Sequence, residues 1–199
     1  MRYIYLISPK KIKKNFYKDL DEVLSLNKVK YFQLRLKNLS DKKIINVSKK
    51  IIKITSKHNV KFIINDKYKL VKEIGADGCH VGQKDGPLKE IKRFLGKKIF
   101  GITCHNSLVL AKKAIKFKPT YLAFGSFNKS NLKPKAIKAD FKLIPNIKKK
   151  IKIPIVAIGG INNNNYKTLQ KLGVNLIAIS SFIWDNPELK PKQAIKKFI

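Results

Sequence analysis

The pattern that decides the fold occurs in residues 61–81, which read KFIINDKYKLVKEIGADGCHV. Two short apolar runs, Lys61–Asn65 and Gly78–Val81, have the length and composition of buried strands. The residues between them, Lys67–Ile74, space their apolar side chains as a helix does. A strand, a helix and a second strand in this order predict two parallel strands joined by a crossover helix.

The same alternation continues from this unit toward both ends of the chain. Further strands are predicted at Tyr3–Ser8, Tyr31–Leu36, Ile99–Thr103, Tyr121–Gly125, Ile155–Ile158 and Leu176–Ser180. Further helices are predicted at Asn15–Asn27, Ser40–Ile54 with Ser40 as N-cap, Leu88–Leu95, Ser107–Lys116, Phe141–Lys149, Tyr166–Leu172 and Pro191–Phe198. About eight such units in 199 residues predict an α/β fold, a single (β/α)8 TIM barrel. An open, doubly wound sheet is the alternative.

Composition narrows the class of protein. The chain has no linker rich in proline, glycine or serine, so we expect residues 1–199 to form one TIM-barrel domain. A hydrophobic share of 44% excludes wholesale disorder, and the longest apolar run, Ile153–Ile161, is too short to span a membrane. Met1–Ser8 lacks the features of a signal peptide, and Cys79 and Cys104 make neither a disulfide framework nor a metal cluster. We therefore expect a cytoplasmic protein with no membrane partner.

The charge of the chain has two interpretations. Lysine and arginine number 45 against 12 acidic residues, which gives a net charge of +33. Such an excess attracts nucleic acids and other polyanions, but it also arises when an AT-rich coding sequence favours Lys, Ile and Asn. The lysines are dispersed along the chain and arginine, the better reader of phosphate and guanine, is scarce. These two facts favour the second interpretation, so we expect no specific nucleic-acid partner.

Polar side chains at the end of the second predicted strand indicate an anion site. Alternate residues of a strand face opposite sides, so Gln33, Arg35 and Lys37 share one face while Leu34 and Leu36 share the other. The leucines belong against the surrounding helices, which turns the polar face toward the barrel interior and mouth. Charges there need a partner, either an anionic ligand or an internal carboxylate.

Two of the few acidic residues follow neighbouring strands. Asp66 comes after Lys61–Asn65, and Asp85 comes shortly after Gly78–Val81. Adjacent strands lie about 5 Å apart, so the two carboxylates meet at the mouth of the barrel. Hard oxygen ligands of this kind favour Mg²⁺, which takes one or two carboxylates together with substrate phosphates. The alternatives are a helix N-cap for Asp66 and a turn residue for Asp85.

The last two strands carry features of a phosphate site. Gly159 and Gly160 follow one strand and let backbone N–H groups approach a phosphate, while Ser180 and Ser181 add hydroxyl and backbone donors after the next. The loops after strands seven and eight bind phosphate in many barrels. Residues 126–138 are expected to form a basic loop that acts as a lid.

In combination these motifs resemble one known family. They are Gln33–Lys37, Phe62–Lys67, Gly75–Asp85, Ala157–Ile161 and Ser181. In their order and spacing they resemble thiamine phosphate synthase over nearly the whole chain. The resemblance implies a (β/α)8 barrel that joins hydroxymethylpyrimidine diphosphate to thiazole phosphate and releases pyrophosphate. These two small molecules are the expected partners, and no oligomeric state is predicted.

The resemblance also implies roles for individual residues. It implies Mg²⁺ held by Asp66 and Asp85. The residues implied for catalysis are Arg35, Lys37, Thr103 and Lys133. Those implied for substrate binding are Gln33, Arg35, Lys37, Asn65, Thr103, Ser130, Lys133, Gly160, Ser180 and Ser181. Thr103 stands where the family has a serine, and Leu132 stands where it has a threonine.

Two further functions compete with this one. A thiazole tautomerase of the same barrel family would use a histidine at the position of His105 to move a proton and would need no metal. A nucleic-acid or polyanion-binding protein would use the surface that carries the +33 charge. Neither accounts for Arg35, Lys37, Asp66 and Asp85 together, so the synthase is the favoured prediction.

Overall fold

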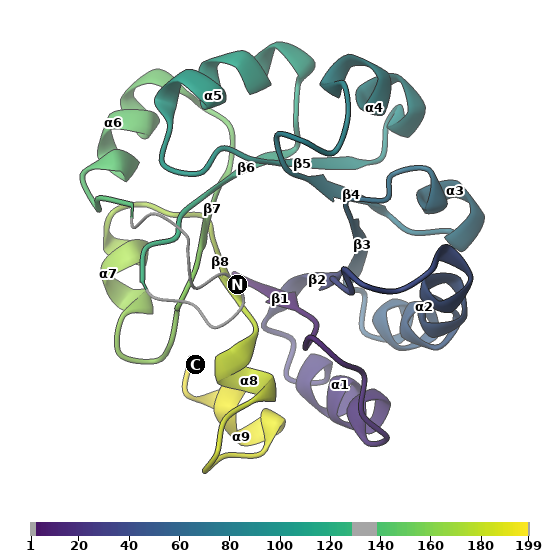
Figure 1. Ribbon diagram of the computed structural model, residues 1–199. Coiled ribbons are helices and arrows are strands. Elements are labelled where there is room, and N and C mark those ends of the chain that lie inside the picture. The colour runs from purple at the N-terminus through teal and green to yellow at the C-terminus, as the bar shows by residue number, and fades with distance from the viewer. Residues whose placement is uncertain (1–2, 129–138, 199) are drawn as a thin grey trace.

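The computed structural model describes residues 3–128 and 139–198, in which eight parallel strands close into a barrel in chain order (Figure 1). The strands are β1 (Ile4–Ile7), β2 (Val29–Leu34), β3 (Lys61–Asn65), β4 (Gly78–Val81), β5 (Ile99–Thr103), β6 (Tyr121–Phe124), β7 (Ile155–Ile158) and β8 (Leu176–Ile179). β1 pairs with β8, with Ile4 opposite Ile177, so the sheet has no free edge. The predicted TIM barrel is confirmed, and the open sheet is excluded.

Helices lie around the outside of the ring of strands (Figure 1). They are α1 (Phe16–Leu24), α2 (Asp41–Lys57), α3 (Leu70–Ile74), α4 (Leu88–Leu95), α5 (Leu108–Ala114) with the 3-10 turn η1 (Ile115–Phe117), α6 (Leu143–Lys150), α7 (Tyr166–Lys171), α8 (Ser181–Trp184) and α9 (Pro191–Lys196). Ser40 caps α2 as predicted, because its side chain accepts a hydrogen bond from the Lys43 N–H.

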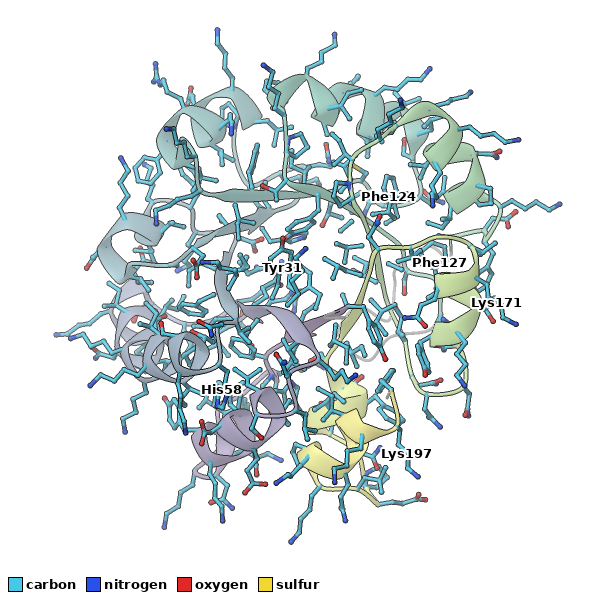
Figure 2. The ribbon with its side chains drawn as sticks, turned by 180° about the vertical axis from the view of Figure 1, so that it is seen from behind. Tyr31, His58, Phe124, Phe127, Lys171 and Lys197 are labelled. Atoms are coloured by element: carbon cyan, nitrogen blue, oxygen red, sulfur yellow. The ribbon has the colours of Figure 1, made fainter. Side chains whose placement is uncertain are left out.

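Strand alternation divides the apolar side chains into two cores. The outer core lies between strands and helices and holds Leu34 from β2 and Leu36 from the residues that follow it. The inner core fills the barrel with bulky side chains such as Tyr5, Tyr31 and Tyr121. Figure 2 shows Tyr31 inside the ring, whereas Lys171 and Lys197 point away from it. A TIM barrel therefore has a packed interior, and space for a ligand is left at its mouth.

The predicted and observed bounds of most elements differ by one to three residues, and two differences need separate comment. β2 begins two residues earlier than predicted and ends at Leu34, because the Arg35 N–H donates to the Ser8 hydroxyl at 2.9 Å instead of extending the strand ladder. The short helix α8 follows β8 directly and was not predicted. Four residues are too few to show a helical period.

Two expectations from the sequence concern membrane-spanning helices and the two cysteines. No helix within residues 3–128 and 139–198 combines the length and apolar character needed to cross a bilayer. Cys79 and Cys104 are both buried and carry free thiols. Burial raises the pKa of the Cys104 thiol to about 12, so this group stays protonated at neutral pH.

Candidate active site

A cavity of about 340 Å³ opens at the carboxyl end of the barrel. It is lined by every predicted site residue that the structure describes: Gln33, Arg35, Lys37, Asn65, Asp66, Asp85, Thr103, Gly160, Ser180 and Ser181. The remaining two, Ser130 and Lys133, and most of the expected lid lie outside the described residues. Residues from six different strands and their loops are thus brought to one place.

One wall of the cavity carries two cations and two carboxylates. Arg35 and Lys37 come from the residues after β2, and Lys37 Nζ lies 3.6 Å from Asp66 Oδ2. Burial lowers the pKa of the Arg35 guanidinium, while the nearby Asp66 carboxylate raises it. Both cations line the cavity, as predicted, although they lie just beyond the end of β2.

Asp66 and Asp85 interact directly at this wall. Burial raises the pKa of the Asp66 carboxyl, and the neighbouring Asp85 carboxyl raises it further. Lys37 and Arg35 oppose this rise without cancelling it. Asp66 also adopts a left-handed backbone conformation with φ 63°, which is strained for a residue with a side chain. Two carboxylates held together in this way repel each other when both are ionised, and a bound cation would relieve that repulsion.

The donor set fits Mg²⁺. No group of three or more His, Cys, Asp or Glu side chains forms a metal cage in the part of the chain that the structure describes. Mg²⁺ does not need one, since it keeps waters and combines one or two carboxylates with substrate phosphates. Asp85 Oδ2 accepts a 2.6 Å hydrogen bond from the Gly82 N–H, which fixes the orientation of this carboxylate.

The opposite wall is made by the loops after β7 and β8. Gly159 and Gly160 have positive φ values of 97° and 59°. A Cβ at Gly159 would lie 1.9 Å from Ser126 Oγ, so only glycine fits there. Asn165 Nδ2 donates to the Gly160 carbonyl at 2.9 Å and braces the loop.

This wall differs from the prediction at Ser180. α7 begins at Tyr166, as predicted, so loop backbone lies between Gly160 and the helix. The Ser180 hydroxyl donates to the Ser8 carbonyl at 3.0 Å, so its proton is used in a hydrogen bond within the barrel and not for a ligand. Gly160 and Ser181 are left as the predicted residues of this wall for a phosphate.

A chain of hydrogen bonds crosses the floor of the cavity. Gln33 Nε2 donates to the Tyr5 hydroxyl at 2.8 Å, and the Tyr5 and Tyr121 hydroxyls lie 2.6 Å apart. His80 joins Tyr121 to Thr103: its Nδ1 lies 3.1 Å from the Tyr121 hydroxyl and its Nε2 lies 2.7 Å from Thr103 Oγ1. All five side chains are buried. We call this set the floor chain.

The sequence did not reveal Tyr5, Tyr121 and Gln83 as residues of the site. Tyr5 and Gln83 line the cavity, and Gln83 Nε2 donates to the Thr103 carbonyl at 2.5 Å. The alternation along β1 that brings Tyr5 inward was a usable signal, whereas nothing local distinguishes Gln83. His105 also lines the cavity, two residues beyond β5, with φ 51°.

Comparisons with known proteins agree with this geometry. Residues 4–183 match the family model described as thiamine monophosphate synthase. The thiamine-phosphate synthase of Pelagibacter ubique is 49% identical over 98% of this chain and 95% of its own length. That of Clostridium tetani is 36% identical over 94% of this chain and 90% of its own. The chain belongs to the thiamine monophosphate synthase family.

A solved structure of the same family supports the assignment. The thiamine phosphate pyrophosphorylase of Pyrococcus furiosus superposes with a TM-score of 0.85 at 26% identity, covering 98% of this chain and 92% of that one. The orotidine 5′-phosphate decarboxylase of Pyrococcus horikoshii, at 14% identity and a TM-score of 0.68, shares the fold alone.

Family membership decides between the functions predicted from the sequence. The chain is a thiamine-phosphate synthase, a transferase of thiamine biosynthesis that acts on small molecules. The relatives support neither the tautomerase that would use His105 nor the polyanion-binding protein. The family model begins at β1 and ends in α8, so it includes every strand of the barrel.

Proposed function

We propose that the cavity binds hydroxymethylpyrimidine diphosphate together with Mg²⁺ and transfers the pyrimidine to thiazole phosphate, giving thiamine phosphate and pyrophosphate. The observation that carries this proposal is the wall on which Arg35 and Lys37 face the carboxylates Asp66 and Asp85. A small diphosphate with its cation matches all four charges at once.

The reaction places simple demands on the protein. The bond between the pyrimidine methylene carbon and the diphosphate oxygen breaks, and its electron pair leaves with pyrophosphate. The thiazole nitrogen then donates its lone pair to the methylene carbon and forms the new C–N bond. No proton is transferred, so neither a protein nucleophile nor a general base is required. Catalysis consists of orienting two substrates and stabilising the charge of the leaving group.

Cationic side chains stabilise that leaving charge. Arg35 and Lys37 hold the diphosphate oxygens, with Asn65 beside them on the same wall. Thr103 adds a hydroxyl at the cavity floor. Lys133, predicted from the sequence, completes this set in our proposal. Because the site is partly closed to water, each of these contacts is stronger than it would be on the surface.

Asp66 and Asp85 would hold Mg²⁺ at the edge of the same wall. Bound there, the ion supplies positive charge that lowers the energy of the departing pyrophosphate. The two aspartates keep this position ready, since Gly82 orients Asp85 and Lys37 contacts Asp66.

Across the cavity, Gly160 and Ser181 would hold the phosphate of the thiazole, with the Ser130 hydroxyl and the Ser180 backbone as the other predicted contacts. Gln33 on the floor would contact the pyrimidine ring between the two phosphate positions. The pyrimidine then lies between its leaving group and its acceptor. We place the activity in the cytoplasm, in keeping with the free thiols of Cys79 and Cys104.

A reconstituted reaction tests the proposal. Purified protein, hydroxymethylpyrimidine diphosphate, thiazole phosphate and Mg²⁺ are expected to yield thiamine phosphate and pyrophosphate in equal amounts. EDTA is expected to stop the reaction and added Mg²⁺ to restore it. Absence of product, or turnover unaffected by EDTA, would overturn the proposed substrates or the proposed metal respectively.

Two arginines provide a matched pair for the diphosphate wall. Arg35→Met removes a cation that lines the cavity, whereas Arg93→Met removes an exposed one on α4. We expect the first to lower kcat/KM by about 100-fold or more and the second to leave it within about 2-fold. Equal effects would mean that general surface charge, and not this wall, serves the reaction.

A further inference from the structure

Two loops at the mouth of the barrel are joined by one lysine side chain. Lys67 lies in the loop after β3, directly after Asp66. Its Nζ donates to the carbonyl of Leu39, in the loop after β2, at 3.1 Å, and it also forms an ion pair with Asp41, the first residue of α2. Lys67 therefore holds the loop after β2 at the point where that loop enters the helix.

The loop after β2 (residues 35–40) is held on both sides of Lys37. At its start, the Arg35 N–H donates to the Ser8 hydroxyl at 2.9 Å. Lys37 itself is about half exposed, and its Nζ lies 3.6 Å from Asp66 Oδ2, too far for a strong hydrogen bond. The contact at Leu39 holds the loop two residues beyond Lys37, on the side away from Ser8.

Lys67 makes these contacts from outside the cavity. Asp66 lines the cavity, whereas Lys67 is not among the described residues that line it. The Lys67 ammonium is paired with the Asp41 carboxylate, so the pair as a whole adds no net charge beside the site. An effect of Lys67 on a ligand therefore acts through the position of the loops that it joins.

The spacing of these loops matters because a ligand of the charged wall touches both. The cations Arg35 and Lys37 come from the loop after β2, and the carboxylate of Asp66 comes from the loop after β3. A diphosphate with its Mg²⁺ must meet the cations and the carboxylate at the same time. A displacement of about 1 Å between groups that act together can cost about 100-fold in rate.

We propose that Lys67 is a positioning residue that fixes the loop carrying Lys37 against the loop carrying Asp66, and that this spacing determines the affinity of the cavity for a diphosphate with its Mg²⁺. The inference rests on the proposed function for the identity of this ligand. It makes binding depend on a residue outside the cavity, which acts through Lys37 and does not touch the ligand.

Binding of inorganic pyrophosphate in the presence of Mg²⁺, measured by isothermal titration calorimetry, tests the inference without turnover. Lys67→Met removes both contacts and is expected to raise the Kd of pyrophosphate by about 10-fold. Lys67→Arg keeps a cationic donor and is expected to bring the Kd back to within about 3-fold of the unaltered protein. A Kd that does not change in Lys67→Met overturns the inference.

A lysine at the other end of the barrel provides the matched control. Lys98 Nζ donates to the Ala76 carbonyl at 2.6 Å, so it also ties two segments together through a backbone oxygen. Lys98→Met is expected to leave the Kd of pyrophosphate within about 2-fold. Thermal unfolding checks that each variant folds. If Lys67→Met does not fold, Asp41→Asn replaces it, since this change removes the ion pair alone and is expected to raise the Kd by about 3-fold.

A double-mutant cycle distinguishes positioning from a general loss of structure. In the Lys37→Met protein the cation that Lys67 positions is gone. Adding Lys67→Met, or Asp41→Asn, to that protein is expected to change the Kd of pyrophosphate by no more than about 2-fold. The same increase in Kd in both backgrounds would show that Lys67 does not act through Lys37, and would overturn the inference.

Failure of the inference and failure of the proposed function give different results. An unaltered protein that shows the expected coupling in pyrophosphate binding, yet forms no thiamine phosphate, would support the role of Lys67 and overturn the proposed function. A protein that forms thiamine phosphate but shows additive effects of Lys37→Met and Lys67→Met would overturn the inference alone. Pyrophosphate that does not bind to the unaltered protein with Mg²⁺ would also overturn the inference, and the reconstituted reaction then decides the function separately.

Discussion

Two lysine–aspartate pairs at opposite ends of the barrel show how differently one kind of contact is used. Lys61 and Asp77 lie at the amino end, where Lys61 Nζ donates to Asp77 Oδ1 at 2.9 Å and the Phe62 N–H donates to Asp77 Oδ2 at 2.8 Å. Lys37 and Asp66 lie at the carboxyl end, 3.6 Å apart, and Asp66 also faces a second carboxylate.

The difference lies in how completely each carboxylate is satisfied. Both oxygens of Asp77 hold the start of β3 in place, so this residue belongs to the fold. Asp66 is held on a strained backbone beside Asp85, and its lysine is too distant for a strong hydrogen bond. A ligand that binds beside Asp66 can supply the contacts that this carboxylate lacks.

The largest expected effect comes from removing one charge from each pair. Asp66→Asn is expected to lower kcat/KM by about 100- to 1,000-fold, because it removes a metal ligand beside the leaving group. Its thermal stability is expected to stay equal or rise, because the repulsion from Asp85 is lost. Asp77→Asn is the control and is expected to keep its activity while losing about 0.5–1 kcal/mol of stability. Steady-state kinetics and thermal unfolding on both variants would expose any reversal of this pattern.

The lysines give the next largest effect. Lys37→Met is expected to raise the KM for the pyrimidine diphosphate by about 10- to 100-fold, since a hydrogen bond to a charged group is lost. Lys61→Met removes the same charge at the other end of the barrel and is expected to leave KM unchanged. Similar KM values for the two variants would show that overall charge, and not position, governs binding.

The pKa of a carboxylate that is well paired with cations shifts in the opposite direction from the pKa of one that is not, and acid titration can measure both. Hydrogen bonds from His58 and then Lys57 lower the pKa of Asp21 below 3.8, whereas burial and Asp85 raise the pKa of Asp66 above it. The stability from Asp21 is present above the unfolded pKa and is lost as pH falls through the folded one. For Asp66 the stability is present at low pH and is lost as pH rises through its folded pKa.

Carboxyl ¹³C chemical shifts in the metal-free protein measure both midpoints directly. We expect the Asp21 midpoint below 3.8 and the Asp66 midpoint above it. Asp21→Asn is expected to make the protein less sensitive to acid unfolding than the unaltered chain. Equal midpoints for the two residues would remove the electrostatic distinction between them.

Ionic strength gives the smallest effect. A net charge of +33 is spread over both ends of the barrel, and it attracts anionic substrates at long range. We expect kcat/KM to fall by about 3- to 10-fold between low and high salt as this field is screened, with kcat nearly constant. A kcat/KM that does not depend on salt would mean that only the lysines of the mouth matter.

Most of the fold follows from local pattern. The bounds of β3, β4, β5 and β7 agree with the predicted ones. Strands of a parallel sheet are buried on both faces, so each appears in the sequence as a short apolar run bounded by glycines or polar residues. The observed end of β2 differs from the predicted one because it depends on a hydrogen bond to Ser8, a residue far away in the chain. Local sequence carries no information about such a partner.

In the candidate site, too, some residues could be predicted from local sequence and others could not. Asp66 and Asp85 were predictable, because scarce acids after adjacent strands of a parallel sheet must meet at one edge. The commitment of the Ser180 hydroxyl to Ser8 was not, and neither was the contact of Gln33 with Tyr5. These contacts depend on rotamers and on side chains from several strands, which only the closed barrel brings together.

Closure of the barrel has a consequence for synthesis of the chain. β1 cannot gain its second neighbour until β8 has been made, since Ile4 pairs with Ile177. Until then, every growing chain on a polysome carries an open strand edge that could join the same edge of the next chain. Lysines dispersed along the whole sequence give the unfinished chains a large positive charge, so these chains repel each other until β8 has been made.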